Sequence, residues 1–160
     1  MNKGALFSSD RIYRYALWRI WEPRQGFCMF ICLNPSSADE TVDDPTIRRC
    51  MRYATAWGYG GIYITNLFAF RTKDPRIMKR AIDPVGPQND FHLVSTAKEA
   101  TLVIAAWGTA GSHLNRDADV CKIVWPMECL RVTKAGHPAH PLYLPKGLTP
   151  IPFSRAGNKY

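Results

Sequence analysis

The chain has 160 residues, enough for one domain with a full hydrophobic core, and its apolar and charged fractions are those of an ordinary globular protein. No apolar stretch is long enough to cross a bilayer, and the N-terminus lacks the apolar core of a signal peptide. The formal net charge of +8 favours a polyanionic partner, although many basic proteins bind no nucleic acid. We therefore expect one cytoplasmic domain over residues 1–160 that does not bind a membrane.

The five cysteines do not form the closely spaced pairs that hold zinc or iron–sulfur clusters. They are odd in number and several lie in apolar segments, which is typical of reduced, buried thiols. A metal site assembled from Cys50, Cys121, Cys129 and a histidine stays open as an alternative. We expect neither a metal nor another cofactor.

An unbroken apolar run over residues 27–33 ends at Asn34-Pro35. Such a run is typical of a strand buried on both faces, as in a parallel sheet covered by helices. Pro35 has no N–H and biases Asn34 toward an extended conformation, so the strand must end there. Polar side chains just past the carboxyl end of a central strand lie where open α/β sheets bind ligands. The alternative is an ordinary exit from a strand into a loop.

The segment before this run, residues 11–21, is rich in aromatic and β-branched side chains and predicts a strand. Residues 22–26 predict a turn, which would pair the two strands as a hairpin. The strand's three arginines are interpreted as a solvated face of an edge strand: Arg11, Arg14 and Arg19.

Further along the chain, short buried strands are predicted over 62–65, 101–106 and 129–133. Helices are predicted over 45–57, from 75 onward, over 88–99 and over 112–124, followed by an irregular tail over 146–160. This alternation predicts a three-layer α/β/α fold, with a central, mostly parallel four-stranded sheet and an N-terminal antiparallel hairpin. The strand exits Asn34, Asn66, Trp107-Gly108 and His137 then share one rim.

These four exits, in this order, resemble the motifs of the uracil-DNA glycosylase superfamily. Residues 32–36 (Cys-Leu-Asn-Pro-Ser) are similar to its water-positioning loop, and residues 62–71 to its base-reading strand exit. Residues 103–108 end on Trp-Gly, as the family's third strand does, and residues 137–142 (His-Pro-Ala-His-Pro-Leu) resemble its closing motif. The resemblance implies one uracil-DNA glycosylase-like domain that hydrolyses the N-glycosidic bond of a modified or mismatched base in DNA. We also expect the protein to be a monomer.

The strongest likeness is to a family of uncharacterised bacterial and phage proteins, a domain of unknown function. That family shares Leu-Asn-Pro-Ser-x-Ala-Asp-Glu, here residues 33–40, and Asp-Pro-Thr-Ile-Arg-Arg, here residues 44–49. It implies no established activity. The chain also departs from the glycosylase pattern, because Cys32 replaces a glycine and the closing motif has one additional residue, His140.

The glycosylase resemblance implies catalytic roles for particular residues. Asn34, helped by Asp39 or Asp43, would hold the attacking water, and His137 would donate to the developing oxyanion of the base. Asn66 has one acceptor and two donors with which to read a base edge. Because an amide is not a general base, Asn34 in place of aspartate implies a slower or more selective enzyme.

The same resemblance assigns residues that would bind the base and residues that would bind the phosphate backbone of the nucleic acid. Phe68 or Phe70 would stack on the base, with Tyr53 as another option. The nucleic-acid contacts would come from Ser36, Ser37, Arg48, Arg71, Lys134 and His140.

Each of these residues also has an ordinary structural interpretation, such as a helix cap for Asp43-Asp44 or a turn residue for His137. Two other functions stay open. One is a nucleic-acid or nucleotide-binding module without catalysis, and the other is an N-glycoside hydrolase that acts on free nucleotides or RNA.

Overall fold

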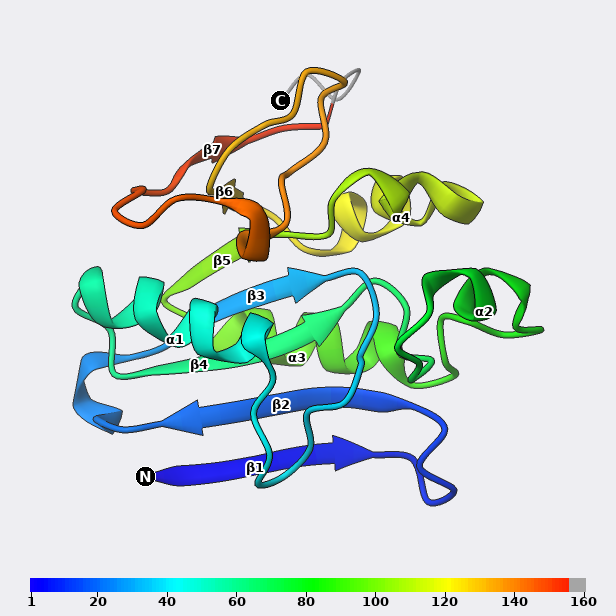
Figure 1. Ribbon diagram of the computed structural model, residues 1–160, viewed down its shortest axis with the longest axis horizontal. Helices are drawn as coiled ribbons and strands as arrows, with labels where there is room; N and C mark the ends of the chain where they lie inside the picture. The colour runs from blue at the N-terminus through cyan, green and yellow to red at the C-terminus, as the bar shows by residue number, and fades with distance from the viewer. Residues whose placement is uncertain (156–160) are drawn as a thin grey trace.

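The computed structural model describes residues 1–155, and the strands in this part of the chain form a single mixed sheet (Figure 1). Its spatial order is β1-β2-β4-β3-β5-β6-β7. The strands are β1 (Asn2–Phe7), β2 (Arg14–Ile20), β3 (Cys28–Cys32), β4 (Gly61–Asn66), β5 (Leu102–Ala105), β6 (Met127–Cys129) and β7 (Ile151–Phe153). The four central strands, β4, β3, β5 and β6, are parallel, which confirms the predicted parallel core. The outer strands β1, β2 and β7 are antiparallel to their neighbours.

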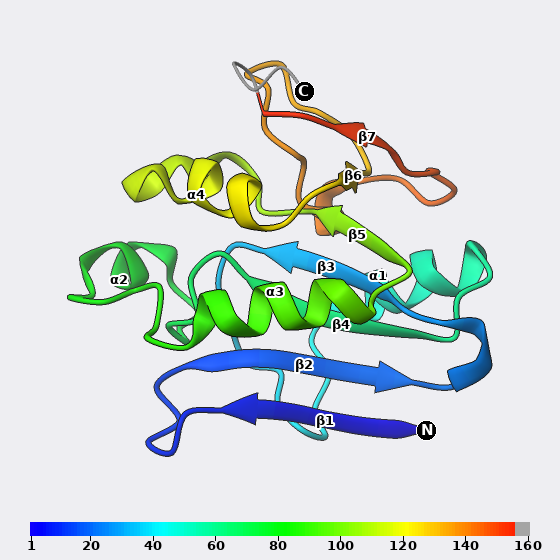
Figure 2. The same ribbon diagram turned by 180° about the vertical axis from the view of Figure 1, so that it is seen from behind.

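Helices lie on both faces of this sheet, so the predicted α/β class is confirmed. They are α1 (Pro45–Ala56), α2 (Pro75–Arg80), α3 (Asn89–Glu99) and α4 (Arg116–Ile123). Helix α1 lies in front of the sheet in Figure 1, whereas α3 and α4 lie on the opposite face, seen in Figure 2. Asp44 caps α1 through its side chain and is followed by Pro45 at the first helical position, as the sequence predicts.

Strand β3 is buried on both faces, which explains its continuous apolar sequence. Cys28, Phe30 and Cys32 belong to the core under α1. Met29 and Ile31 alternate with them and belong to the core on the α3–α4 side. Since full burial of one large apolar side chain contributes about 1.5–3 kcal/mol, this strand is a main source of the stability of both layers.

The predicted hairpin between residues 11–21 and 27–33 is wrong. Strand β4 lies between β2 and β3, pairing antiparallel with the first and parallel with the second. The N-terminal hairpin is instead β1 with β2. Strand β1 has a short, mixed sequence with Lys3 and Gly4, which carries no periodic signal that predicts a strand.

The C-terminal third also differs in detail from the prediction. The helix predicted over 112–124 divides into a 3-10 segment, η2 (Thr109–Asn115), and α4. The last parallel strand ends at Cys129, and β7 forms within the tail predicted to be irregular. Residues 156–160 of that tail lie outside the described residues.

Two of the three arginines assigned to a solvated face are buried. The exposed fractions are 2% for Arg14 and 0% for Arg19. The prediction failed because β1 covers the edge of β2, and the acidic loop before α1 lies over its face. Only Arg11 is exposed, and its guanidinium pairs with Glu40 at 2.7 Å.

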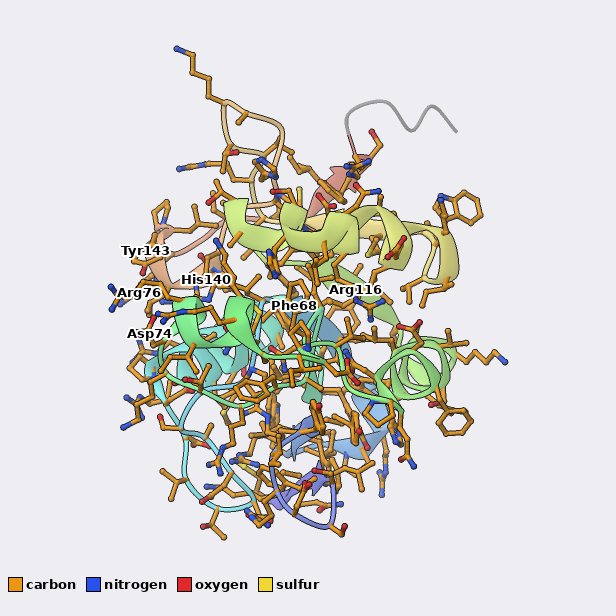
Figure 3. All side chains as sticks on the ribbon, turned by 90° about the vertical axis from the view of Figure 1, so that its right-hand side faces the viewer. Phe68, Asp74, Arg76, Arg116, His140 and Tyr143 are labelled. Carbon is orange, nitrogen blue, oxygen red and sulfur yellow. The ribbon has the colours of Figure 1, made fainter. Side chains whose placement is uncertain are left out.

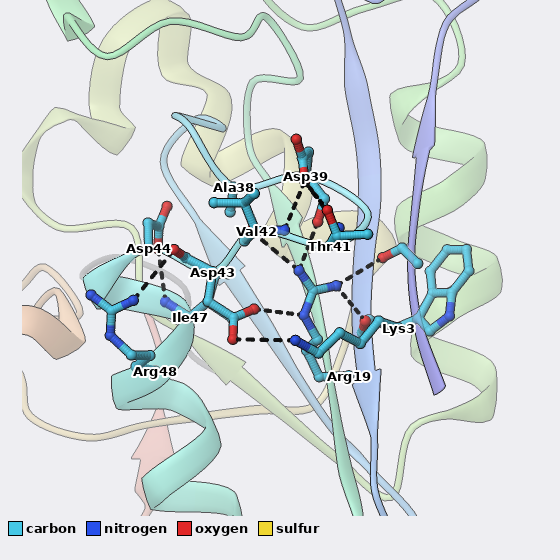
Figure 4. A network of polar contacts seen from close by, with 12 residues as sticks. Lys3, Arg19, Ala38, Asp39, Thr41, Val42, Asp43, Asp44, Ile47 and Arg48 are labelled. Carbon is cyan, nitrogen blue, oxygen red and sulfur yellow. Dashed lines mark hydrogen bonds and ion pairs between the residues drawn. The ribbon is translucent and has the colours of Figure 1, made fainter. Parts of the chain in front are cut away.

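Arg19 holds the acidic loop to the sheet (Figure 4). Its Nε donates to Asp43 Oδ1 at 2.7 Å. Its remaining nitrogens donate to the carbonyl oxygens of Gly4, Trp18, Asp39 and Val42. A single buried side chain therefore connects β1, β2 and the loop that leads into α1.

We predict that Arg19→Met lowers the free energy of unfolding by about 3 kcal/mol or more, because it leaves Asp43 and several buried carbonyl groups without their partner. Urea unfolding followed by circular dichroism measures the change. The matched control is Lys3→Met, since Lys3 is half-exposed and lies 3.9 Å from the same carboxylate. This variant should lose less than about 1 kcal/mol. Equal midpoints for wild type and Arg19→Met would contradict the anchoring role.

Candidate functional site

A cavity of about 480 Å³ lies at the carboxyl ends of β3, β4 and β5, a usual size for a small-molecule site. The start of α1 forms one wall, and the segment around the 3-10 turn η3 (Pro141–Tyr143) forms another. Figure 3 looks onto this edge of the sheet and labels His140 and Tyr143, both of which line the cavity. Four predicted site residues line it together: Asn34, Ser36, Asn66 and His140.

The two asparagines present different groups. Both Asn34 amide hydrogens are used, because Nδ2 donates to the carbonyl oxygens of Thr72 at 2.9 Å and Pro35 at 3.1 Å. Any contact between this amide and a ligand is therefore made by the acceptor Oδ1. Asn66 is 1% exposed, and its Nδ2 has no hydrogen-bond partner among the described residues. Its amide offers an unpaired donor, and an unpaired buried donor is costly unless a ligand or water accepts from it.

His140 is the histidine of the closing motif that lines the cavity. Its Nδ1 accepts the N–H of Leu142 at 3.2 Å, so the neutral ring carries its proton on Nε2. Burial lowers the pKa of His140 below the ordinary 6.5, and the negative charge of Asp44 only partly opposes this. Near neutral pH, His140 is thus a neutral donor.

His137, the expected catalytic histidine, does not line the cavity. Its N–H donates to Thr133 Oγ1 at 3.1 Å, and its carbonyl accepts the N–H of Thr133 at 2.7 Å. The turn that these bonds close places His137 away from the cavity. The N–H of Gly108, after β5, donates to the carbonyl of Pro138 at 2.8 Å and so brings the later part of the motif to the cavity.

The expected catalytic carboxylates Asp39 and Asp43 do not line the cavity either. Asp39 Oδ1 accepts the backbone N–H groups of Thr41 and Val42, and Asp43 pairs with Arg19. Both are structural parts of the loop. The carboxylate at the cavity is Asp44, whose Oδ1 accepts the N–H of Ile47 at 2.9 Å. The sequence identified Asp44 only as a helix cap, because a capping position does not reveal whether the same carboxylate also borders a cavity.

The aromatic residues expected to stack on a base lie elsewhere. Phe68 is fully buried in the α3–α4 core and is labelled near the centre of the view in Figure 3. Phe70 lines a separate surface pocket with Tyr13, and the Tyr53 hydroxyl donates to the carbonyl of Pro145. The aromatic side chain at the cavity that sequence reasoning missed is Tyr143, which is 83% exposed and lies 5.6 Å from the His140 ring, centroid to centroid.

The expected phosphate contacts are also outside the cavity, apart from Ser36 and His140. Arg71 donates to the carbonyl oxygens of Ser36 and Ser37, and so holds this loop in place. Arg48 donates to the carbonyl of Asp43, and Lys134 is an exposed residue. Neither Ser37, Arg48, Arg71 nor Lys134 lines the cavity.

Arg14 lines the cavity and was missed altogether. Strict alternation in β2 would place it on the face of Trp18, opposite Leu17 and Arg19. The pairing with β1 shifts by one residue, however, because Leu6 pairs with Ala16 and Phe7 with Arg14. Such a bulge changes the direction of a side chain. Here it places Arg14 on the α1 side of the sheet.

The described residues contain no helix long and apolar enough to cross a membrane. Among residues 1–155, no group of three or more His, Cys, Asp or Glu side chains is arranged to hold a metal ion. The five cysteines are buried and free of disulfides, and their burial agrees with the expectation from sequence.

The chain matches the family described as Protein of unknown function (DUF1643) over residues 14–142 and belongs to it. The matched segment begins at Arg14 and includes Asn34, Asp44, Asn66 and His140. No curated protein matches the chain, and no solved structure does. The expected likeness to a domain of unknown function is confirmed, and the match brings no activity with it.

We predict that the histidine in the cavity makes the fold less stable in mild acid. Below pH 6.5 and above the lowered pKa of folded His140, the unfolded chain binds more protons, so the free energy of unfolding falls as the pH falls. Between pH 7.5 and about 5, the free energy of unfolding should fall less for His140→Gln than for wild type, as measured by urea unfolding. The variant lacks the contribution of His140 and keeps that of His92, whose pKa is also lowered by burial.

The NMR titration of His140 provides a second check on the same groups. In Asp44→Asn, which keeps a capping side chain, the pKa of His140 should fall further because a negative charge is removed. A His140 that titrates at or above 6.5 would contradict its burial in the neutral form.

Proposed function

We propose that the cavity binds a nucleobase and that the protein is an N-glycosidase of the uracil-DNA glycosylase type, which releases a modified or mismatched base from DNA. One observation carries this proposal: Asn34 and Asn66, each from a motif that resembles that superfamily, line one cavity together with His140, the additional residue of the closing motif. They follow different strands and come from distant parts of the chain, so the sheet topology is required to bring them together.

The chemistry requires groups that stabilise a departing base. Cleavage of the glycosidic bond leaves negative charge on the base, and hydrolysis adds the hydroxyl of water to C1′ and the proton of water to the base. The Nε2–H of neutral His140 is a donor for a base oxygen as that charge develops. The unpaired Nδ2 of Asn66 is a second donor and can form a hydrogen bond with an acceptor on the base edge.

Water activation is assigned to the wall formed by Asn34 and Asp44. Asn34 Oδ1 is an acceptor that can orient a water molecule, because its Nδ2 is held by Thr72. Asp44 supplies the carboxylate that the sequence had assigned to Asp39 or Asp43, and it lies at the same cavity. A carboxylate can accept a proton from water, which an amide cannot do.

A hydrolase of free nucleotides is the second candidate. The basic side chains expected to hold a DNA backbone, Arg48 and Arg71, donate to carbonyl groups of the protein itself. The cationic side chain that does line the cavity is the buried Arg14. This arrangement favours a small ligand that enters the cavity as a whole.

We predict release of free base from at least one member of a panel of duplexes with uracil, mismatched or hypermodified bases, or from nucleotides. Abasic sites are measured by alkaline cleavage and free bases by mass spectrometry. Loss of one donor to a developing oxyanion costs about 10²–10³-fold in rate. The rate of base release should therefore be lower by roughly that factor in His140→Ala and in Asn66→Ala.

The matched control is His137→Ala, which removes the same type of side chain from the same motif but outside the cavity. It should retain wild-type activity. A rate loss in His137→Ala with none in His140→Ala would contradict the assignment. Tight binding of nucleic acid with no base released from any substrate would leave a binding module as the function.

A further inference from the structure

The lack of a carboxylate partner sets Arg14 apart from the other buried arginines. The side chains of Arg14, Arg19 and Arg116 are 2%, 0% and 4% exposed, respectively. Arg19 pairs with Asp43 and Arg116 with Asp90. No carboxylate of the described residues lies within 4.0 Å of the Arg14 guanidinium. Arg14 is thus the buried cation without an ion pair in this part of the chain, and it lines the cavity.

The hydrogen bonds of Arg14 are also incomplete. Its Nη1 donates to the carbonyl of Ala38 at 3.0 Å, whereas its Nε has no partner. Burial lowers its pKa to about 10, so the guanidinium is still protonated near neutral pH. An unpaired charge and an unpaired donor in a protein interior are both costly, and a bound anion would relieve both. The planar fork of arginine matches the two oxygens of a carboxylate or phosphate.

A second unpaired donor lies on the neighbouring strand. Asn66 ends β4, which pairs with β2 through Leu17 and Ile64, and its Nδ2 is buried and unpartnered. Arg14, Asn66 and His140 all line this one cavity. Arg14 and Asn66 each have a donor without a partner among the described residues, and His140 has an Nε2–H opposite its bonded Nδ1. Asp44 disfavours an anion on its own side of the cavity, because its carboxylate is negatively charged. Its charge acts on both Arg14 and His140. A bound anion would therefore contact Arg14 and Asn66 rather than the Asp44 wall.

We propose that Arg14 and one of the two unpaired hydrogens of Asn66 Nδ2 form an anion-binding subsite, which leaves the other hydrogen for the base edge, so that the ligand of this cavity carries a phosphate or a carboxylate group. The subsite itself rests on these two side chains, whereas the nucleotide nature of the ligand rests on the proposed function. The same acidic chemistry can come from two sources. One is the phosphate of a free nucleotide, and the other is a carboxylate on a modified base.

The test is isothermal titration with four probes: inorganic phosphate, nucleoside 5′-monophosphates, the matching neutral nucleosides, and 5-carboxyuracil. The monophosphates or the carboxylated base should bind at least about 10-fold more tightly than the neutral nucleosides, as a charged hydrogen bond contributes enough for a factor of that size. Preference for the monophosphates identifies a free nucleotide, and preference for 5-carboxyuracil identifies a modified base. Equal affinity for neutral and anionic probes, or no binding of any anionic probe, would overturn the subsite.

Variants separate Arg14 from the general basic charge of the protein. Arg14→Met should weaken binding of the anionic probe by roughly 10- to 100-fold and bring it close to that of the nucleoside. Arg11→Met removes the same charge from an exposed position and should leave the affinity within about 2-fold, since exposed charges are screened by salt. Equal losses in the two variants would overturn the proposal.

Thermal unfolding gives a readout that does not depend on the variant. Millimolar monophosphate or carboxylated base should raise the Tm of wild type more than the neutral nucleoside does, because only ligands that bind the native state stabilise it. Arg14→Met should itself unfold at a temperature no lower than Arg19→Met, since it removes a charge that has no ion pair. Should Arg14→Met not fold, the anion-specific rise in the Tm of wild type decides the question.

The failures of the two proposals are distinguishable. Arg14-dependent anion binding without any base release contradicts the glycosidase and leaves the subsite in place. Base release together with an affinity for the anionic probes that is unchanged in Arg14→Met contradicts the subsite and leaves the glycosidase in place.

Discussion

The buried guanidinium of Arg19 fixes the loop that joins β3 to α1, and the geometry of the cavity depends on that loop. Arg19 pairs with Asp43 and donates to carbonyl groups of Asp39 and Val42. The next residue, Asp44, caps α1 and lines the cavity. Because the first turn of α1 forms one wall, a single structural ion pair sets the position of the catalytic candidates without contacting the ligand itself.

Two buried arginines on one strand therefore have opposite roles. Arg19 has a carboxylate and four carbonyl groups around it, and such satisfied groups specify one arrangement of the chain. Arg14, turned onto the same face by a bulge, has one carbonyl and an unpaired Nε. A protein keeps a poorly satisfied buried charge where function requires it, so the contrast points to Arg14 as a ligand contact.

Much of the core was predictable from sequence, and the site was only partly so. The continuous apolar run of β3 and the Asp44-Pro45 start of α1 carry local signals, and both were predicted correctly. Strand order was not predictable, because the insertion of β4 between β2 and β3 depends on long-range pairing. Asn34 and Asn66 follow strand ends and reach the cavity as expected. His140 rather than His137 lines the cavity because of one turn, and Arg14 is buried on the α1 side because of one bulge. Neither feature has a sequence signature here.

The central claim is that three side chains from distant parts of the sequence, Arg14, Asn66 and His140, contact one nucleotide or modified base in this cavity. Side-chain NMR during titration with the tightest-binding probe tests it most directly. The account predicts that the signals of Arg14 Nε–H, Asn66 Nδ2–H and His140 Nε2 shift together and saturate at one Kd. Unchanged signals for these three groups, with shifts confined to the exposed basic surface, would contradict it.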